Sequence, residues 1–188
     1  LALKKLLSEG MHKMILDLRD NPGGYLHSAK QISNTFLSKG QTIVITKTNT
    51  GEQEKSVAKG DGIFQKGHII ILVNEQSASA SEIVAGAIQD NDRGWIIGRR
   101  TFGKGLVQKQ MPLGGGDAVR LTIAKYFTPS GRSIQKPYSN NRNEYYDDLN
   151  NRFENGEMAD QTKIPIIDSL SYKTPKGRIV YGGGGIIP

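Results

Sequence analysis

Two short segments supply residue types that together could cleave an acyl bond without histidine. The first is the run SASASE at positions 77–82, and the second is TFGKG at positions 101–105, which places a lysine at position 104. A serine hydroxyl is a weak nucleophile at neutral pH and needs an adjacent base, and a lysine whose pKa is lowered by burial can be that base. The pair predicts a Ser-Lys hydrolase.

The serines lie between an apolar run that ends at Val73 and a helical pattern that begins near position 79. Unpaired N–H groups and the positive end of a helix would therefore surround them, and such a place stabilises an oxyanion. A capping box formed by Ser79 and Glu82 is the purely structural alternative. Spacing alone leaves Ser77, Ser79 and Ser81 as candidates for the nucleophile.

Lys104 also ends the pattern GxxxxGK at positions 98–104, which is typical of a phosphate-binding loop. The next residue is Gly105 instead of Ser or Thr, so the magnesium ligand of such loops is missing. Residues 106–112 favour a strand over the helix whose N-terminus would hold a phosphate. The sequence therefore disfavours nucleotide binding, and a solvent-exposed turn lysine is the structural alternative.

A third segment, DLRDNPGG at positions 17–24, ends in a glycine pair. Glycines after a strand allow bare N–H groups to face a cavity, as oxyanion holes require, although a simple Pro-Gly turn would use the same residues. Asp17 and Asp20 lie beside an arginine in a turn and are not interpreted as an acid–base pair. The three histidines are scattered and no metal-ligand spacing is found, so neither a histidine triad nor a metal cofactor is predicted.

Periodicity predicts helices that alternate with strands around these segments. Strands are expected at 14–18, 42–46, 54–58, 68–73, 95–98 and 118–127, and helices at 3–11, 26–37 and 79–89. The unbroken apolar run at 68–73 is typical of a strand that is covered on both faces. The pattern predicts an α/β core over roughly the first two thirds of the chain.

The remaining third changes character. Residues 129–160 are rich in polar side chains and predict a surface segment with one short helix at 144–153. Residues 169–181 predict a closing β-hairpin that turns at 174–177. The segment is expected to cover the core and not to form a second domain, so residues 1–188 are treated as one unit.

Composition excludes several classes of protein. The absence of cysteine excludes disulfides, thiol catalysis and Cys-ligated zinc. The net charge of +7 is spread along the chain instead of forming a basic stripe, which disfavours a nucleic-acid partner. No stretch approaches the roughly 20 apolar residues that cross a bilayer. Because the chain opens without Met on a helical pattern, we expect a fragment whose N-terminus lies upstream.

Four motifs in this order resemble those of the carboxy-terminal processing peptidases, also called tail-specific proteases. They are ILDLRDNPGG at 15–24, VNEQSASASEI at 73–83, TFGKGLVQ at 101–108 and YFTPSGRSI at 126–134. The resemblance covers residues 13–134 closely and the polar remainder more loosely. It implies a crotonase-like (ClpP/crotonase) spiral of αββ units and a serine endopeptidase that cleaves proteins recognised through their C-terminal tails by forming an acyl-enzyme.

The resemblance also implies a role for each matching residue. Ser79 would be the nucleophile, Lys104 the general base and Gln108 the residue that orients the lysine. The implied backbone donors of the oxyanion hole are those of Ala80 and of either Gly23 or Gly24. The resemblance implies no cofactor.

Members of the family usually carry an export signal and a PDZ domain that captures the substrate, and this chain begins after both would have passed. We therefore expect residues 1–188 to be a catalytic-core fragment whose closing strand would continue beyond the last residue. The resemblance places the full-length protein in a bacterial envelope, in the periplasm or on the membrane. Expected partners are proteins or peptides with apolar C-terminal tails, with a homo-oligomer also compatible and no nucleic acid or nucleotide. A catalytically silent peptide-binding scaffold is the alternative.

Overall fold

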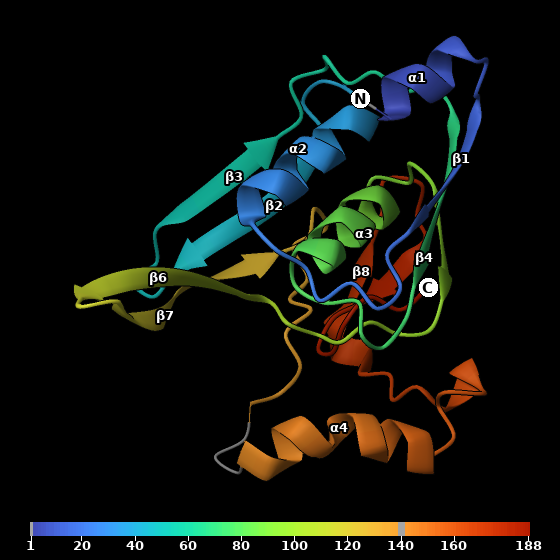
Figure 1. Ribbon diagram of the computed structural model, residues 1–188. Helices are drawn as coiled ribbons and strands as arrows, with labels where there is room; N and C mark the ends of the chain where they lie inside the picture. The colour runs from blue at the N-terminus through green and yellow to red at the C-terminus, as the bar shows by residue number, and fades with distance from the viewer. Residues whose placement is uncertain (1, 139–141) are drawn as a thin grey trace.

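A computed structural model describes residues 2–138 and 142–188 and shows a three-stranded and a four-stranded β-sheet with a helix between them, and a separate two-stranded sheet (Figure 1). The helices are α1 (Ala2–Ser8), α2 (Leu26–Phe36), α3 (Ala80–Asp90) and α4 (Arg142–Glu154), with 3₁₀ turns at Gln161–Lys163 and Asp168–Leu170. The strands are β1 (Lys13–Asp17), β2 (Thr42–Thr48), β3 (Gln53–Val57), β4 (His68–Val73), β5 (Trp95–Gly98), β6 (Leu106–Gly114), β7 (Asp117–Phe127), β8 (Ser171–Lys173) and β9 (Ile179–Tyr181). The predicted α/β class is confirmed.

The first sheet has three parallel strands in the order β1-β4-β5. Parallel strands place their carboxyl ends at the same edge, so the loop after β1 and the loop after β4 are neighbours. The N–H of Leu18, just beyond β1, still donates to the carbonyl of Leu72 in β4 at 2.9 Å. This edge therefore brings the glycine pair and the serine run together, although they are more than fifty residues apart in the sequence.

The second sheet is antiparallel, in the order β3-β2-β7-β6. β2 and β3, which match strands predicted from the sequence, form a hairpin, and β6 and β7 form a longer one that extends away from the body of the molecule (Figure 1). β6 begins two residues after Lys104 and ends the sheet as an edge strand. β8 and β9 pair only with each other, as the predicted closing hairpin.

α3 is the central element of the core. It packs against β2 of one sheet, β5 of the other and α2, and its residues from Ser81 to Asp90 are all buried. The helix that the sequence predicts at 144–153 is present as α4, slightly longer at both ends.

The prediction that β4 is covered on both faces is wrong. Ile69, Ile71 and Val73 are buried against the core, whereas Ile70 on the opposite face is only half-buried. Its neighbour Trp95 in β5 is 66% exposed. The helix α3 covers one face of the parallel sheet, and the other face stays in partial contact with solvent.

Candidate active site

Ser79 occupies the turn between β4 and α3 and has an unusual backbone conformation. Its φ of 54° and ψ of −114° lie outside the regions that a residue with a side chain prefers. Strained conformations of this kind persist where the surrounding structure holds them, and they concentrate at functional sites. The strain places a half-buried serine at the start of a buried helix.

The flanking serines are committed to structural hydrogen bonds. The hydroxyl of Ser77 is fully buried and donates to the carbonyl of Leu18 at 2.7 Å. The hydroxyl of Ser81 is also buried and donates to the carbonyl of Asn21 at 3.1 Å. Both bonds fix the serine run to the loop after β1, so the structure favours Ser79 among the three candidates left open by spacing.

The carboxylate of Glu82 connects the serine turn, residues 74–79 between β4 and α3, to the lysine segment, residues 99–105 between β5 and β6. One oxygen, Oε2, accepts the N–H of Ser79 and the N–H of Lys104, each at 2.8 Å. The other oxygen accepts the Thr101 hydroxyl at 2.5 Å and the N–H of Gly103 at 2.7 Å. Burial of this fully enclosed carboxyl raises its pKa, and the four donors oppose that rise. Glu82 is thus the common anchor of both predicted catalytic segments.

Tyr126 in β7 joins the same two segments a second time. Its hydroxyl lies 3.1 Å from the carbonyl oxygen of Ser79 and 2.8 Å from that of Lys104. The ring is almost fully buried, and burial together with the nearby charge of Glu82 raises the pKa of the phenol well above its usual value of 10.0. The hydroxyl therefore keeps the proton with which it binds these carbonyls.

The structure brings the backbones of Ser79 and Lys104 together but does not join their side chains by a hydrogen bond. Lys104 is half-buried, and within residues 2–138 and 142–188 no hydrogen bond or ion pair of its ammonium is recorded. Gln108 is exposed on β6 and lines the same pocket as Ser79. The roles predicted for these side chains in catalysis stay predictions.

A pocket of about 110 Å³ opens beside Ser79. Polar groups of the wall come from Ser79, Ala80, Gly24 and Gln108, and its apolar side chains are those of Leu26, Ile83, Leu106 and Val107, with Tyr25 and Tyr126 completing it. The pocket joins the residues predicted for the nucleophile and the oxyanion hole in one cavity. Its size suits a single small side chain beside the serine.

The two glycines of the pair differ in their surroundings. Gly23 has a φ of 98°, and its N–H donates to the side chain of Asn21 at 2.9 Å. Gly24 lines the pocket, and among the described residues its N–H has no recorded acceptor. Gly24 is thus the glycine of the pair that lines the pocket and whose N–H is not bonded to another described residue.

A Gly23→Ala variant is expected to lose about 2 kcal/mol or more of unfolding free energy. A Cβ at this position would lie 2.5 Å from the carbonyl oxygen of Ala78 and 2.9 Å from Cβ of Ser79, at a φ that favours glycine. Gly24→Ala is the matched control, because nothing lies within 4 Å of its added Cβ. Urea denaturation of both variants measures the difference, and equal stability would contradict the close approach.

The hypothesis of a phosphate-binding loop is contradicted by the same contacts. The N–H groups of Gly103 and Lys104, which a phosphate would need, donate to the carboxylate of Glu82. The N–H of Gly105 donates to the side chain of Gln135 at 2.8 Å. The segment then continues as β6 and not as a helix. A second anion at this position would be repelled by the carboxylate.

The acidic residues of the loop after β1 have structural partners. The Arg19 guanidinium hydrogen-bonds to Asp17 at 2.7 Å and holds the pKa of that carboxyl at about 2. Asp20 accepts from the side chain of Asn74 at 2.8 Å, and Asn74 accepts from its N–H in return. These bonds shape the loop that carries the glycine pair, consistent with the interpretation that Asp17 and Asp20 are not an acid–base pair.

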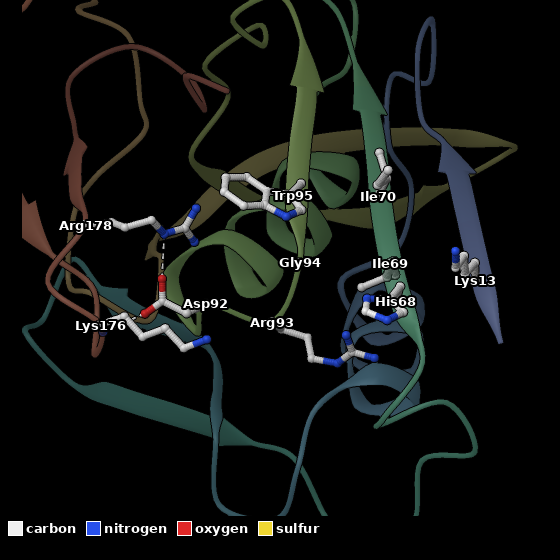
Figure 2. Close-up of a pocket in the computed structure, with 10 residues that line it drawn as sticks. All are labelled: Lys13, His68, Ile69, Ile70, Asp92, Arg93, Gly94, Trp95, Lys176 and Arg178. Atoms are coloured by element: carbon white, nitrogen blue, oxygen red, sulfur yellow. Dashed lines mark hydrogen bonds and ion pairs between the residues drawn. The ribbon is translucent and has the colours of Figure 1, made fainter.

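A larger pocket lies elsewhere on the molecule. It encloses about 550 Å³ at the outer face of β4 and β5, where Figure 2 shows Lys13, His68, Trp95 and Arg178 around it. Its Arg178 is paired with Asp92 at 2.6 Å. The pocket contains no residue of the serine turn or the lysine segment, so it is separate from the candidate active site.

The sequence identified Ser79, Lys104 and Gln108 through their motifs but missed the joining role of Glu82 and Tyr126. Glu82 was visible only as part of a capping box. Tyr126 lies with Ala124 on the buried face of β7, and the sequence did not predict the two carbonyls that its hydroxyl contacts.

Comparison with known proteins identifies the family. The model of peptidase family S41 matches residues 1–140, and the chain therefore belongs to this family. It is 44% identical over 135 residues to a carboxyl-terminal-processing protease of Synechocystis, covering 72% of this chain and 31% of the relative. It is 46% identical over 131 residues to a carboxy-terminal-processing protease of Bartonella bacilliformis, covering 70% of this chain and 30% of that protein.

A solved structure of a photosystem II D1 C-terminal processing protease is similar in fold. It superposes with a TM-score of 0.64 at 36% identity, over 71% of this chain and 34% of that one. The chain thus spans about a third of the length of the relatives it matches. In the part of the chain that the structure describes, no helix is long and apolar enough to span a membrane.

Proposed function

We propose that this chain carries the catalytic core of a serine endopeptidase in which Ser79 is the nucleophile and Lys104 the general base. One observation carries the proposal. Of the three serines in the run, only Ser79 is exposed to the pocket, and its backbone shares one oxygen of Glu82 with the backbone of Lys104.

In the proposed reaction Lys104 acts as the general base. Its amine takes the proton of the Ser79 hydroxyl, and the serine oxygen attacks the scissile carbonyl carbon to give a tetrahedral oxyanion. The lysine then gives its proton to the leaving amine, and the acyl-enzyme forms. In the second half of the reaction the lysine takes a proton from water, and the water oxygen attacks the ester carbonyl. The bond to the serine oxygen then breaks, the lysine returns the proton to Ser79, and the carboxylic acid product leaves. Gln108 on β6 would orient the lysine.

The N–H groups of Ala80 and Gly24 would stabilise the oxyanion. Both residues line the pocket beside Ser79, and both N–H groups lack a recorded acceptor among the described residues. Two preorganised donors at a developing charge typically contribute a large share of catalysis, about 10²–10³-fold for each donor. Gly23 would serve instead to let the loop approach the serine turn, as its close contacts require.

The substrate would bind as an added strand along the edge strand β6, where unpaired backbone groups can pair with a peptide. We propose that proteins with apolar C-terminal tails are selected, that a PDZ domain elsewhere in the full-length protein captures those tails, and that the protein works in a bacterial envelope. The two sheets and α3 would belong to a crotonase-like spiral. These proposals rest on the family resemblance.

Cleavage of an unfolded protein with an apolar C-terminal tail tests the proposed function. The peptidase is expected to convert this substrate into shorter products. It is also expected to react with a fluorophosphonate probe at Ser79, and peptide mapping by mass spectrometry identifies the labelled residue. Ser79→Ala should abolish both readouts, and Ser169→Ala, an exposed serine near β8, should leave both unchanged.

Labelling of Ser77 or Ser81 instead would contradict the assignment of the nucleophile. Tail binding by equilibrium dialysis without cleavage or labelling would favour the silent peptide-binding scaffold of the same fold.

A further inference from the structure

α4 lies outside residues 1–140, the part of the chain that the family model matches. Figure 1 shows α4 beneath the segment that connects β5 to β6. That segment is the lysine segment, residues 99–105, which carries Lys104. The hydrogen bonds from α4 to the lysine segment are made by the side chain of Arg152, which is almost completely buried.

Arg152 in α4 holds the carbonyl groups of the lysine segment. Its side chain is only 2% exposed. The guanidinium donates to three successive backbone carbonyls, those of Arg100 at 3.4 Å, Thr101 at 2.9 Å and Phe102 at 3.3 Å. It also pairs with Asp148 one helical turn earlier at 2.9 Å. A buried guanidinium is costly unless its donors are satisfied, and successive carbonyls of the lysine segment satisfy several of them.

Glu82 holds the same segment from the opposite side. It accepts the N–H groups of Gly103 and Lys104, so the carbonyls just before Lys104 bind a cation on α4 while the N–H groups at Lys104 bind a carboxylate on α3. The segment is therefore fixed between two buried charges of opposite sign. Rotating it about its own axis would break both sets of bonds.

Lys136 strengthens this arrangement. Its N–H donates to the carbonyl of Gly103 at 2.9 Å, and its ammonium lies 4.0 Å from the ring centre of Phe102 and 4.2 Å from that of Tyr145 in α4. The ammonium also pairs with Asp148 at 3.2 Å, so one carboxylate of α4 serves both cations. Burial lowers the pKa of Lys136, and Asp148 opposes that change.

A further ion pair ties the beginning of the lysine segment to the turn after α4. Arg100 donates to Glu157 at 2.6 Å, and both side chains are almost fully buried. Arg100 thus contacts the turn after α4, Phe102 contacts Arg152 and Tyr145 of α4, and the carbonyl of Gly103 binds Lys136, which pairs with Asp148 of α4.

From this geometry we propose that Arg152 is a positioning residue for the general base: docking of α4 through Arg152 and Asp148 fixes the lysine segment, and thereby Lys104, against Ser79. The inference rests on the proposed function. It adds a residue outside the motifs that identify the family, and it assigns the polar segment after β7 to support of catalysis. Catalysis is sensitive to such support, since a displacement of about 1 Å can cost roughly 10²-fold in rate.

Four variants test the proposal: Arg152→Ala, Arg152→Lys, Asp148→Asn and, as a matched control, Arg120→Ala on the exposed face of β7. The first readout is kcat and KM for peptide hydrolysis. Arg152→Ala is expected to lower kcat about tenfold to 100-fold with little change in KM. The kcat values of Arg152→Lys and Asp148→Asn should lie between those of Arg152→Ala and the unsubstituted protein. The kcat of Arg120→Ala should equal that of the unsubstituted protein.

The second readout does not need activity. Hydrogen–deuterium exchange of the peptide that contains Gly103 and Lys104 is expected to accelerate at least about tenfold in Arg152→Ala, and not in Arg120→Ala. Thermal unfolding checks that each variant is folded. If Arg152→Ala does not fold, Arg152→Lys and Asp148→Asn provide the same comparison.

The outcomes are distinct. The positioning role would be overturned if hydrogen–deuterium exchange at Gly103 and Lys104 is unchanged in Arg152→Ala. It would also be overturned if kcat falls only in proportion to the loss of stability. Faster exchange with no hydrolysis even by the unsubstituted protein would overturn the proposed function while it supports the contact between Arg152 and the segment. Faster exchange with a selective loss of kcat and partial rescue by lysine supports both.

Discussion

A Lys104→Arg variant is expected to lose about 10³-fold in kcat for peptide hydrolysis while it stays folded. Arginine keeps the positive charge and most of the length of lysine, but its guanidinium does not lose a proton in proteins. It can therefore replace a cation but not a base. Lys104 is half-buried and its backbone is held by Glu82 and Tyr126, so the substitution acts at the side chain without removing these bonds.

The measurement compares kcat and KM of the unsubstituted protein, Lys104→Arg, Lys104→Met and the control Lys173→Arg on the exposed face of β8. Arginine and methionine variants should be equally inactive, and the control should be fully active. An arginine variant that keeps more than about a tenth of the activity would mean that position 104 supplies charge and not proton transfer.

Much of the fold was predictable because short-range physical signals were strong. The apolar run at 68–73 and the helical pattern after it gave β4 and α3 with boundaries within one residue. The closing hairpin of β8 and β9 followed from the turn residues at 174–177. The solvent exposure of the outer face of the parallel sheet could not be predicted. An unbroken apolar run has the same sequence pattern whether a second layer packs on that face or solvent reaches part of it. Ile70 and Trp95 show the latter arrangement.

The candidate site was predictable as motifs but not as a set of contacts. Ser79 and Lys104 follow from the resemblance, yet residue types at 77 and 81 are identical to that at 79, and only burial separates them. Glu82 carries a local signal for helix capping, which hides its bonds to residues about twenty positions further along. Arg152 carries no local signal at all, because its acceptors are backbone carbonyls some fifty positions earlier.

Replacement of Glu82 is expected to separate catalysis from stability. Glu82→Ala removes the acceptor of four donors at a fully buried position, and we expect a loss of about 3–5 kcal/mol of unfolding free energy together with all measurable activity. Glu82→Gln should lose less stability, since burial already raises the pKa of the carboxyl and a neutral amide avoids the cost of burying a charge.

The amide variant should nevertheless lose about 10²-fold in kcat. Its NH₂ group cannot accept a hydrogen bond. If the amide oxygen replaces Oε2, the N–H of Gly103 loses its acceptor, and if it replaces Oε1, the N–H groups of Ser79 and Lys104 lose theirs, so the lysine segment is held less firmly in either case. Urea denaturation and steady-state kinetics on both variants, with Glu52→Gln as the exposed control, measure the two effects separately. Full activity in Glu82→Gln would show that Glu82 stabilises the fold but that catalysis does not depend on the complete set of its hydrogen bonds.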